Sequence, residues 1–239
     1  MILASVVLPL EAKEWPTPKA ARDWLYSLLG KHPEKDAFGL AVLGKSRPAI
    51  RISILDEKLY GDLSRRFWSL IRARIEIGGS PAKVLAVVEE GHPWAKVTTL
   101  PRLFQGKATA DFGFQLLSPT LFRKNGLLYL VPEPALFFSS LKERLTQISK
   151  ISPPAWLDET FSRLTLRHAN LETRAPNWRP EAKGLVGVLT FHLPRANQEE
   201  LRWLRALHQL AYFTGLGEET DIGYGLTRPY IPNTNLGRP

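Results

Sequence analysis

The sequence of 239 residues contains no cysteine. This absence excludes disulfides, thiolate nucleophiles, iron–sulfur clusters and zinc sites built from cysteine, and it favours a cytoplasmic protein. No pair or triplet of histidine, aspartate and glutamate has the spacing of metal ligands, and no phosphate-binding P-loop is present. We therefore expect neither a metal nor a cofactor. His168, His192 and His208 fall at positions of apolar strands or helices and are predicted to be structural.

The sequence also lacks long apolar runs. Its first ten residues are mostly apolar, but they have no basic start and meet Glu11 too soon to span a bilayer or to act as a secretion signal. They are typical of a first strand, and we expect no association with a membrane.

Negative charge is in deficit. Lysine and arginine total 32 against 23 aspartate and glutamate residues, which gives a formal charge of +9. A positive field of this size favours polyanions through phosphate contacts and the release of counterions, although a basic composition can also serve solubility alone. Nucleic acid is the expected partner.

The predicted elements occur in the same order in the two halves of the chain. Apolar residues at strand or helix spacing predict strand, helix, strand, strand, helix, strand in each half. In the first half these elements fall around residues 1–10, 21–28, 38–43, 50–54, 60–71 and 84–88. In the second half they fall around 112–117, 137–148, 164–166, 185–193, 201–211 and 224–229.

This order is the ferredoxin-like pattern, in which both helices cover one face of an antiparallel sheet. We therefore predict an α+β protein of two tandem ferredoxin-like (RRM-like) domains with a cleft between them. The first domain is expected to span residues 1–105 and the second residues 106–239.

Four glycines lie within the eleven residues 215–225, where the last helix ends and the last strand approaches. Glycine permits a positive φ and the close approach of another backbone, as a phosphate chain requires, whereas a helix cap needs only one glycine. The loop can bind RNA through its backbone amides, or it can allow close packing between the domains. The four glycines are Gly215, Gly217, Gly223 and Gly225.

This loop, together with residues 114–122, 130–134, 183–187 and 210–215, resembles the Cas6 family of CRISPR-associated repeat endoribonucleases. The resemblance covers the second half by sequence and the first half by element order. It implies two ferredoxin-like domains that grip repeat RNA in and around their cleft. It also implies cleavage without a metal, in which a ribose 2′-hydroxyl attacks the neighbouring phosphate and leaves a 2′,3′-cyclic phosphate and a 5′-hydroxyl.

The sequence departs from the family at two places. Between the paired glycines the family usually carries lysine or arginine, whereas residues 218–222 here are Glu-Glu-Thr-Asp-Ile. The family's active histidine usually lies close before the basic turn that leads into the strand at Ile50, but residues 38–43 contain none. The nearest histidine is His32, directly after the first helix.

Tyr26, His32 and Lys45 form the expected catalytic set. Tyr26 lies off the apolar stripe of the first helix, so it can face the cleft, and Lys45 lies in the hairpin turn. We expect Tyr26 to orient the substrate or donate a proton, His32 to act as general base or acid, and Lys45 or Arg47 to offset phosphate charge. The alternatives are a boundary-core tyrosine, an exposed loop histidine and a solvated turn lysine.

Basic residues at strand faces and turns are expected to bind RNA, with solvated charged faces as the alternative. Arg163 and Arg167 are predicted to point away from Leu164 and Leu166 on one strand. The expected set is Arg47, Arg51, Arg123, Lys124, Arg163 and Arg167, together with Gly215, Gly217, Gly223 and Gly225.

Three functions stay open at this point. The chain is expected to be a repeat endoribonuclease, with a catalytically silent relative that holds repeat RNA or delivers it to an effector complex as the alternative. The missing histidine at its usual position motivates the second reading. A backbone subunit of such a complex is a third. The expected partners are CRISPR repeat RNA and subunits of an effector complex, and the expected state is a monomer or a homodimer.

Overall fold

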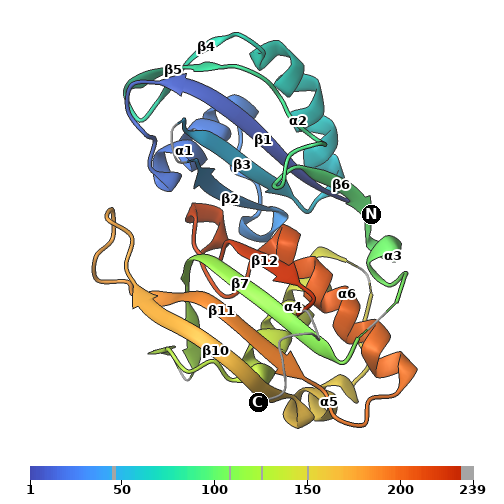
Figure 1. The fold of residues 1–239 in the computed structure, drawn as a ribbon. Helices are drawn as coiled ribbons and strands as arrows, with labels where there is room; N and C mark the ends of the chain where they lie inside the picture. The colour runs from blue at the N-terminus through green and yellow to red at the C-terminus, as the bar shows by residue number, and fades with distance from the viewer. Residues whose placement is uncertain (45–46, 108, 125, 150, 233–239) are drawn as a thin grey trace. The chain divides into compact units, whose positions relative to one another are not determined.

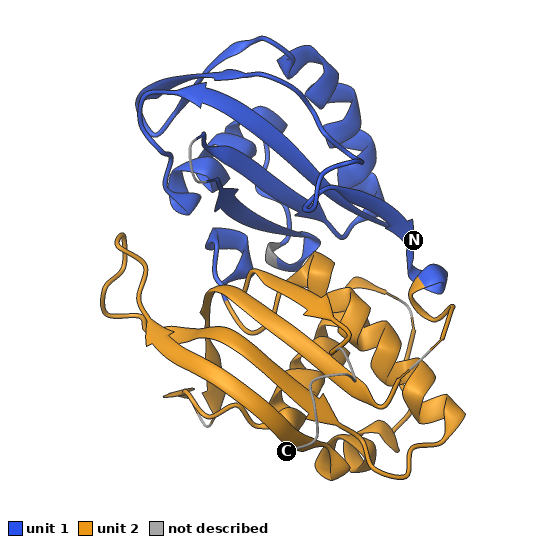
Figure 2. Cartoon of the chain, viewed as in Figure 1, with its two compact units in different colours: residues 1–102, 219–224 blue, residues 103–218, 225–239 orange. Residues whose placement is uncertain are grey.

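The computed structural model describes the chain except residues 45–46, 108, 125, 150 and 233–239, and the side chain of residue 35. The chain forms two compact units (Figure 2). Unit 1 comprises Met1–Arg102 and Glu219–Tyr224, and unit 2 comprises Leu103–Glu218 and Gly225–Pro239. Within the described residues, no helix has both the length and the apolar character to cross a membrane.

Unit 1 has the ferredoxin-like strand order that the sequence predicts. Its main sheet runs β2-β3-β1-β5-β4, all neighbours are antiparallel, and β6 also pairs with β1 (Figure 1). The elements are β1 (Ile2–Ala12), α1 (Pro18–Leu29), η1 (Lys35–Ala37), β2 (Phe38–Leu43), β3 (Ala49–Ile54), α2 (Glu57–Leu70), β4 (Arg74–Ile77), β5 (Ser80–Val84), β6 (Lys96–Thr99) and α3 (Leu100–Leu103).

Local signals in the sequence determine where the two long helices of unit 1 begin and end. The side chain of Thr17 accepts a hydrogen bond from the Ala20 backbone N–H, and Asp56 caps α2 in the same way. Gly30 ends α1 in the left-handed region with a φ of 67°. Apolar residues of both helices pack on the alternate side chains Ile50, Ile52 and Ile54, so α1 and α2 cover one face of the sheet.

The last strand of unit 1 differs from the prediction. The sequence predicts a strand at 84–88, but β5 ends at Val84, and Val88 forms only an isolated bridge with Val7. β4 and β5 form a hairpin around Gly78-Gly79, two residues with positive φ. Such a glycine pair is a recognised hairpin signal, but the predicted order of elements does not include this hairpin. Further along, β6 takes the edge of β1 at Ile2–Ser5.

Unit 2 repeats the same strand order. Its four-stranded antiparallel sheet runs β10-β11-β7-β12, and β8 and β9 form a separate hairpin. The elements are β7 (Asp111–Thr120), β8 (Phe122–Lys124), β9 (Leu127–Tyr129), α4 (Pro134–Ile148), α5 (Leu157–Arg163), β10 (Thr165–Arg174), β11 (Gly184–His192), α6 (Gln198–Thr214) and β12 (Thr227–Tyr230). The closing strand therefore begins at Thr227, three residues later than predicted.

Aromatic side chains form the centre of unit 2. Phe112 and Phe114 of β7 lie edge-to-face against Phe138 of α4, and against His208 of α6 with ring centroids 5.6 and 4.9 Å apart. His208 is buried, and its Nε2 donates to the Gly113 carbonyl oxygen at 2.7 Å, as a structural histidine does. Both units thus have the predicted ferredoxin-like architecture.

Candidate active site

The glycine-rich loop after α6 is shaped by close approaches of the protein's own backbone. Gly215 caps α6, and its N–H donates to the Ala211 oxygen at 3.0 Å. A Cβ on Gly217 would lie 2.1 Å from the Leu121 oxygen, and one on Gly225 would lie 2.0 Å from the Leu216 oxygen. Both residues also have positive φ. These two positions require glycine without any ligand being bound.

The middle of the loop belongs to unit 1. The sequence assigns the whole loop to the second domain, whereas Glu219–Tyr224, which contains the short helix η2 (Thr220–Ile222), lies against α1 and β2. A Cβ on Gly223 would lie 2.7 Å from the Pro18 side chain. This glycine therefore lets the loop pack closely on the first turn of α1.

An ion pair holds the loop to the side of α1. Arg22 Nη1 lies 3.2 Å from Asp221 Oδ2, and the Asp221 side chain is almost completely buried. The guanidinium carbon of Arg22 lies 5.6 Å from the centre of the Tyr26 ring, one helical turn further along α1. The acidic loop residue thus positions a cation beside the predicted catalytic tyrosine.

Tyr26 and His32 lie in direct contact. Their ring centroids are 4.5 Å apart with the rings 62° from parallel, and Tyr26 also lies edge-to-face on Phe38 at the start of β2. The left-handed turn at Gly30 reverses the chain after α1 and brings His32 back against the helix. His32 is exposed, whereas Tyr26 is half-buried. The site therefore presents an imidazole to solvent beside a partly desolvated phenol.

Burial raises the pKa of Tyr26 above its ordinary value of 10.0. The neighbouring Arg22 opposes this shift, and the carboxylates of Asp221 and Asp23 add to it. The phenol thus keeps its proton at neutral pH and is available as a hydrogen-bond donor.

Comparison with known proteins identifies the family. Residues 114–227 match the model of the CRISPR-associated endoribonuclease Cas6. One Cas6 protein is 38–39% identical to this chain, with TM-scores of 0.89–0.90, and covers 96% of this chain and 99–100% of its own. The chain belongs to the Cas6 family. No protein of curated function matches it.

More distant Cas6 structures share the fold. A Cas6 protein from Thermus thermophilus, solved in a product complex, is 25% identical, has a TM-score of 0.86, and covers 96% of this chain and 99% of its own. A chain of a partial Cas6-RT-Cas1–Cas2 complex is 13% identical with a TM-score of 0.65. It covers 99% of this chain and 47% of its own, and its likeness concerns the fold alone.

Of the two cations predicted to offset phosphate charge, only Arg47 can be placed relative to Tyr26 and His32. Lys45 lies outside the described residues. Arg47 is exposed beyond the far end of the β2–β3 hairpin. Phe38, beside Tyr26, begins this hairpin, and five residue steps of strand correspond to about 17 Å. Arg47 is therefore not a neighbour of the Tyr26–His32 pair.

Arg51 is buried on the sheet face of unit 1 that α1 and α2 do not cover. Its Nε donates to the Ser5 hydroxyl at 2.8 Å, and its guanidinium lies 5.1 Å from the centre of the Trp94 ring. Only 4% of Arg51 is exposed, so its charge serves the internal packing of this Cas6 family chain. The alternation of isoleucines with Arg51 and Ser53 correctly predicts that Arg51 points away from the apolar face of the strand. It does not reveal that Trp94 covers the Arg51 side chain.

The basic residues of the β8–β9 hairpin are exposed but paired. Arg123 Nε lies 3.0 Å from Glu218, and Lys124 Nζ lies 2.9 Å from Glu133. The pairing raises the pKa of Lys124 through its hydrogen bond to Glu133. Phosphate contacts by these residues require that RNA replace a carboxylate.

Arg163 does not lie on a strand, as the sequence predicts, but is the last residue of helix α5. Its Nη1 lies 2.6 Å from Glu200 in the capping box of α6, and its Nη2 donates to the Pro194 oxygen at 3.1 Å. Arg163 thus clamps two helices together. Arg167 is on β10, is exposed, and pairs with Asp111 at 3.2 Å.

Arg22 and Asp221 are the site residues that sequence reasoning missed. Arg22 precedes Tyr26 by one helical turn, which is a usable signal. For Asp221, by contrast, the sequence indicates only a departure from the family's basic loop. Within the described part of the chain, no group of three or more histidine, aspartate and glutamate side chains is arranged to hold a metal ion.

Proposed function

We propose that this Cas6 family endoribonuclease cleaves CRISPR repeat RNA at the Tyr26–His32 site without a metal ion. The observation that carries the proposal is the contact between an exposed imidazole and a partly buried phenol, with ring centroids 4.5 Å apart. Imidazoles and phenols are side chains that commonly transfer protons in general acid–base catalysis, which is the chemistry that ribose-phosphate cleavage requires.

His32 is proposed as the general base. It takes the proton of a ribose 2′-hydroxyl, whose oxygen then forms a bond to the adjacent phosphorus while the bond from phosphorus to the 5′-oxygen breaks. A proton passes to the leaving 5′-oxygen, so the products are a 2′,3′-cyclic phosphate and a 5′-hydroxyl. Tyr26, which stays protonated because burial raises its pKa, donates a hydrogen bond or a proton to the reacting phosphate.

Arg22 is proposed as a positioning residue. Its guanidinium is held by Asp221 and lies 5.6 Å from the centre of the Tyr26 ring, so it orients the phenol. Lys45 stays the proposed cation for the charge that develops on the phosphate.

The relatives support the choice of substrate and of a histidine. The Cas6 protein that is 38–39% identical has been solved with a substrate mimic, with product, and as a variant with one histidine replaced by alanine. We assign repeat RNA as the substrate from membership of the Cas6 family, and we assign the histidine's role to His32 because it is the histidine in contact with Tyr26.

The test is cleavage of labelled repeat RNA by the purified protein in EDTA. Cleavage is expected to persist in EDTA and to stop when the attacking nucleotide carries deoxyribose. His32→Ala is expected to lower the rate about 100-fold or more. His168→Ala, which removes an exposed histidine from β10 in unit 2, is the control and should leave the rate unchanged. A fall of less than about threefold for His32→Ala removes it from the mechanism.

A second candidate is a silent relative that binds repeat RNA and hands it to subunits of an effector complex. The acidic segment Glu218–Asp221 favours it, because Asp221 already pairs with the cation nearest to Tyr26. Tight binding of the same RNA without any cleavage would establish this function in place of the first.

A further inference from the structure

A second cationic surface lies at the end of β1, on a different part of unit 1. Two cavities of about 450 and 480 Å³ lie beside the segment Glu11–Lys13 and share it as a wall. Trp15, Arg47 and Pro48 line the first, and Arg74, Pro81 and Lys83 line the second. We call these two cavities and their lining residues the Trp15 groove.

Strand pairing places the groove's cations on one face of the sheet. Lys83 of β5 pairs directly with Glu11 of β1 on one side and with Arg74 of β4 on the other. Directly paired residues point to the same face. Their neighbours Val84 and Ala82 point to the opposite face, into the core beneath α1 and α2. The groove therefore lies on the side of the sheet away from the helices.

The cations of the Trp15 groove form no ion pairs among the described residues, unlike most of the basic residues that the sequence predicts to bind RNA. The side chains of Lys13, Arg47, Arg74 and Lys83 form no ion pair or hydrogen bond with another residue among those described. Of the described residues that line the two cavities, Glu11 is the one carboxylate. Four cations against one carboxylate leave a local excess of positive charge that is free to take phosphates.

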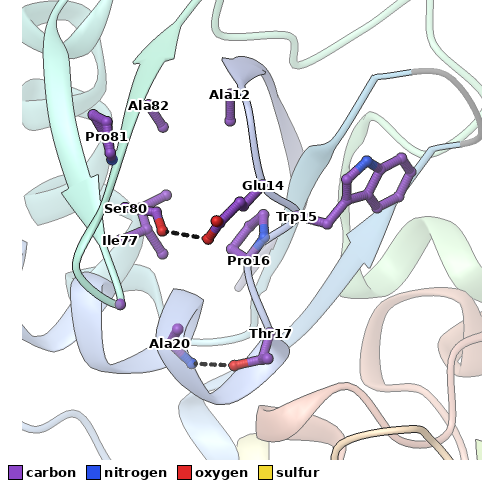
Figure 3. A pocket seen from close by; sticks show the side chains of 11 residues that line it. Ala12, Glu14, Trp15, Pro16, Thr17, Ala20, Ile77, Ser80, Pro81 and Ala82 are labelled. Carbon is purple, nitrogen blue, oxygen red and sulfur yellow. Dashed lines mark hydrogen bonds between the residues drawn. The ribbon is translucent and has the colours of Figure 1, made fainter.

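The exposed indole of Trp15 lines the same cavity as Lys13 and Arg47. Trp15 is 46% exposed although it is a large apolar side chain. Figure 3 shows it turned away from Glu14 and Ser80 and toward the β2–β3 hairpin, and a Cβ on Gly44 would lie 3.0 Å from its ring. On the other side, the Ser80 hydroxyl donates to Glu14 at 2.8 Å next to a smaller cavity of about 170 Å³. The hydrogen bond between Ser80 and Glu14 thus anchors the segment that carries Trp15.

We propose that the Trp15 groove binds a single-stranded segment of RNA, with Trp15 stacking on a base and the four cations contacting phosphates. A positive groove combined with an exposed aromatic ring is the common design of single-strand binding sites. The groove is distinct from the Tyr26–His32 site, because Trp15 precedes α1 and His32 follows this twelve-residue helix, a span of about 18 Å. Binding here requires no cleavage.

The test measures binding of a short fluorescein-labelled oligouridine by anisotropy at several salt concentrations. The double variant Lys13→Gln with Lys83→Gln is expected to lower the slope of log K against log salt by about 1.4, since each phosphate contact contributes about 0.7. Lys58→Gln with Lys96→Gln is the matched control. It removes the same charge from exposed positions on α2 and β6 and should leave the slope unchanged.

The aromatic contact is tested separately. Trp15→Ala is expected to weaken oligouridine binding at least about fivefold, and Trp15→Phe, which keeps a stacking ring, should recover most of it. Trp68→Ala removes an indole that is 71% exposed on α2 and should change nothing. Equal losses in groove and control variants would overturn the proposal. The proposal would also be overturned if an oligoglutamate peptide displaced oligouridine and Trp15→Ala had no effect on binding. The groove would then recognise acidic peptides.

Cleavage assays keep this proposal apart from the proposed function. The groove variants should raise the protein concentration needed for half-maximal cleavage of repeat RNA and leave the maximal rate unchanged. Wild-type protein that binds oligouridine but never cuts repeat RNA refutes the nuclease assignment alone. If cleavage depends on His32 but the groove variants bind oligouridine normally, only the groove proposal is refuted.

Discussion

The ion pair between Arg22 and Asp221 joins two side chains that lie 199 positions apart in the sequence. Because the Asp221 carboxylate is buried and the Arg22 guanidinium lies over Tyr26, loss of either charge should displace the phenol. We expect Arg22→Gln and Asp221→Asn each to lower the single-turnover cleavage rate while the Kd for repeat RNA stays unchanged.

A double-mutant cycle checks this expectation. The combined variant should lose less activity than the sum of the two single losses, with a coupling of about 0.5–3 kcal/mol in activation free energy. Arg22→Lys, which keeps the positive charge, should recover part of the rate. Strictly additive losses, or equal losses of RNA affinity, would show that the pair does not position Tyr26.

His208 gives unit 2 a pH-dependent stability. Burial lowers its pKa to about 4, the hydrogen bond to the Gly113 oxygen opposes this, and nearby Arg205 adds to it. The unfolded chain takes up the proton near the ordinary value of 6.5, so between these values the unfolded state binds more protons. This contribution, about 3 kcal/mol, is complete above 6.5 and is lost as the pH falls toward 4.

The measurement is urea unfolding of wild type and of His208→Gln across this pH interval. Glutamine can donate to the Gly113 oxygen but does not titrate, so the variant should lose about 3 kcal/mol less stability on acidification. Parallel curves for the two proteins would show that His208 is not the group responsible.

At the scale of elements, α5 and α6 depend on one shared carboxylate. Burial raises the pKa of Glu200, but hydrogen bonds from Asn197, Thr160 and Arg163 outweigh it, so the pKa lies below its usual value. Arg163→Ala removes one of these donors from a buried acceptor, and we expect a loss of about 1–3 kcal/mol in the free energy of unfolding.

Urea unfolding also checks this prediction, with Arg174→Ala as the control. Arg174 pairs with Glu172 on β10, but both side chains are more than half exposed, so its loss should cost less than about 0.5 kcal/mol. A stable Arg163→Ala variant with reduced RNA affinity would instead restore the RNA-binding role that the sequence predicts for Arg163.

Elements with strong local signals could be predicted, and those without such signals could not. Thr17, Asp56 and Gly30 determine helix ends through contacts within a few residues, so α1 and α2 were recognisable. α5 is short, and only Leu164 separates its last residue, Arg163, from β10, so the sequence around Arg163 is equally consistent with the start of a strand. The pairing of Gly223 with Pro18 depends on tertiary packing and leaves no local pattern.

The active site divides in the same way. Tyr26 and His32 lie close in sequence on either side of a helix cap, so their proximity could be predicted from helix geometry. Asp221 reaches this site only because residues 219–224 pack with unit 1 while their neighbours on both sides belong to unit 2. No property of the residues near Tyr26 in the sequence indicates that residues 219–224 pack with unit 1.

At the scale of the whole molecule, the net charge of +9 indicates a polyanion but does not show which cations can meet it. Arg123, Lys124 and Arg167 all have carboxylate partners, whereas the cations of the Trp15 groove have none among the described residues. RNA gains most from cations whose charge is not already compensated, since a paired cation must first give up its carboxylate. The low-salt affinity should therefore depend on local pairing more than on total charge.

Removing the two carboxylates that pair with the cations of the β8–β9 hairpin tests this argument. The double variant Glu133→Gln with Glu218→Gln frees Lys124 and Arg123, so the slope of log K against log salt for repeat RNA should steepen by up to about 1.4. Glu34→Gln with Glu143→Gln raises the net charge equally at exposed positions. If local release governs binding, this control tightens binding far less. Equal tightening by both variants would mean that the long-range field of the protein, and not the freed hairpin cations, sets the affinity.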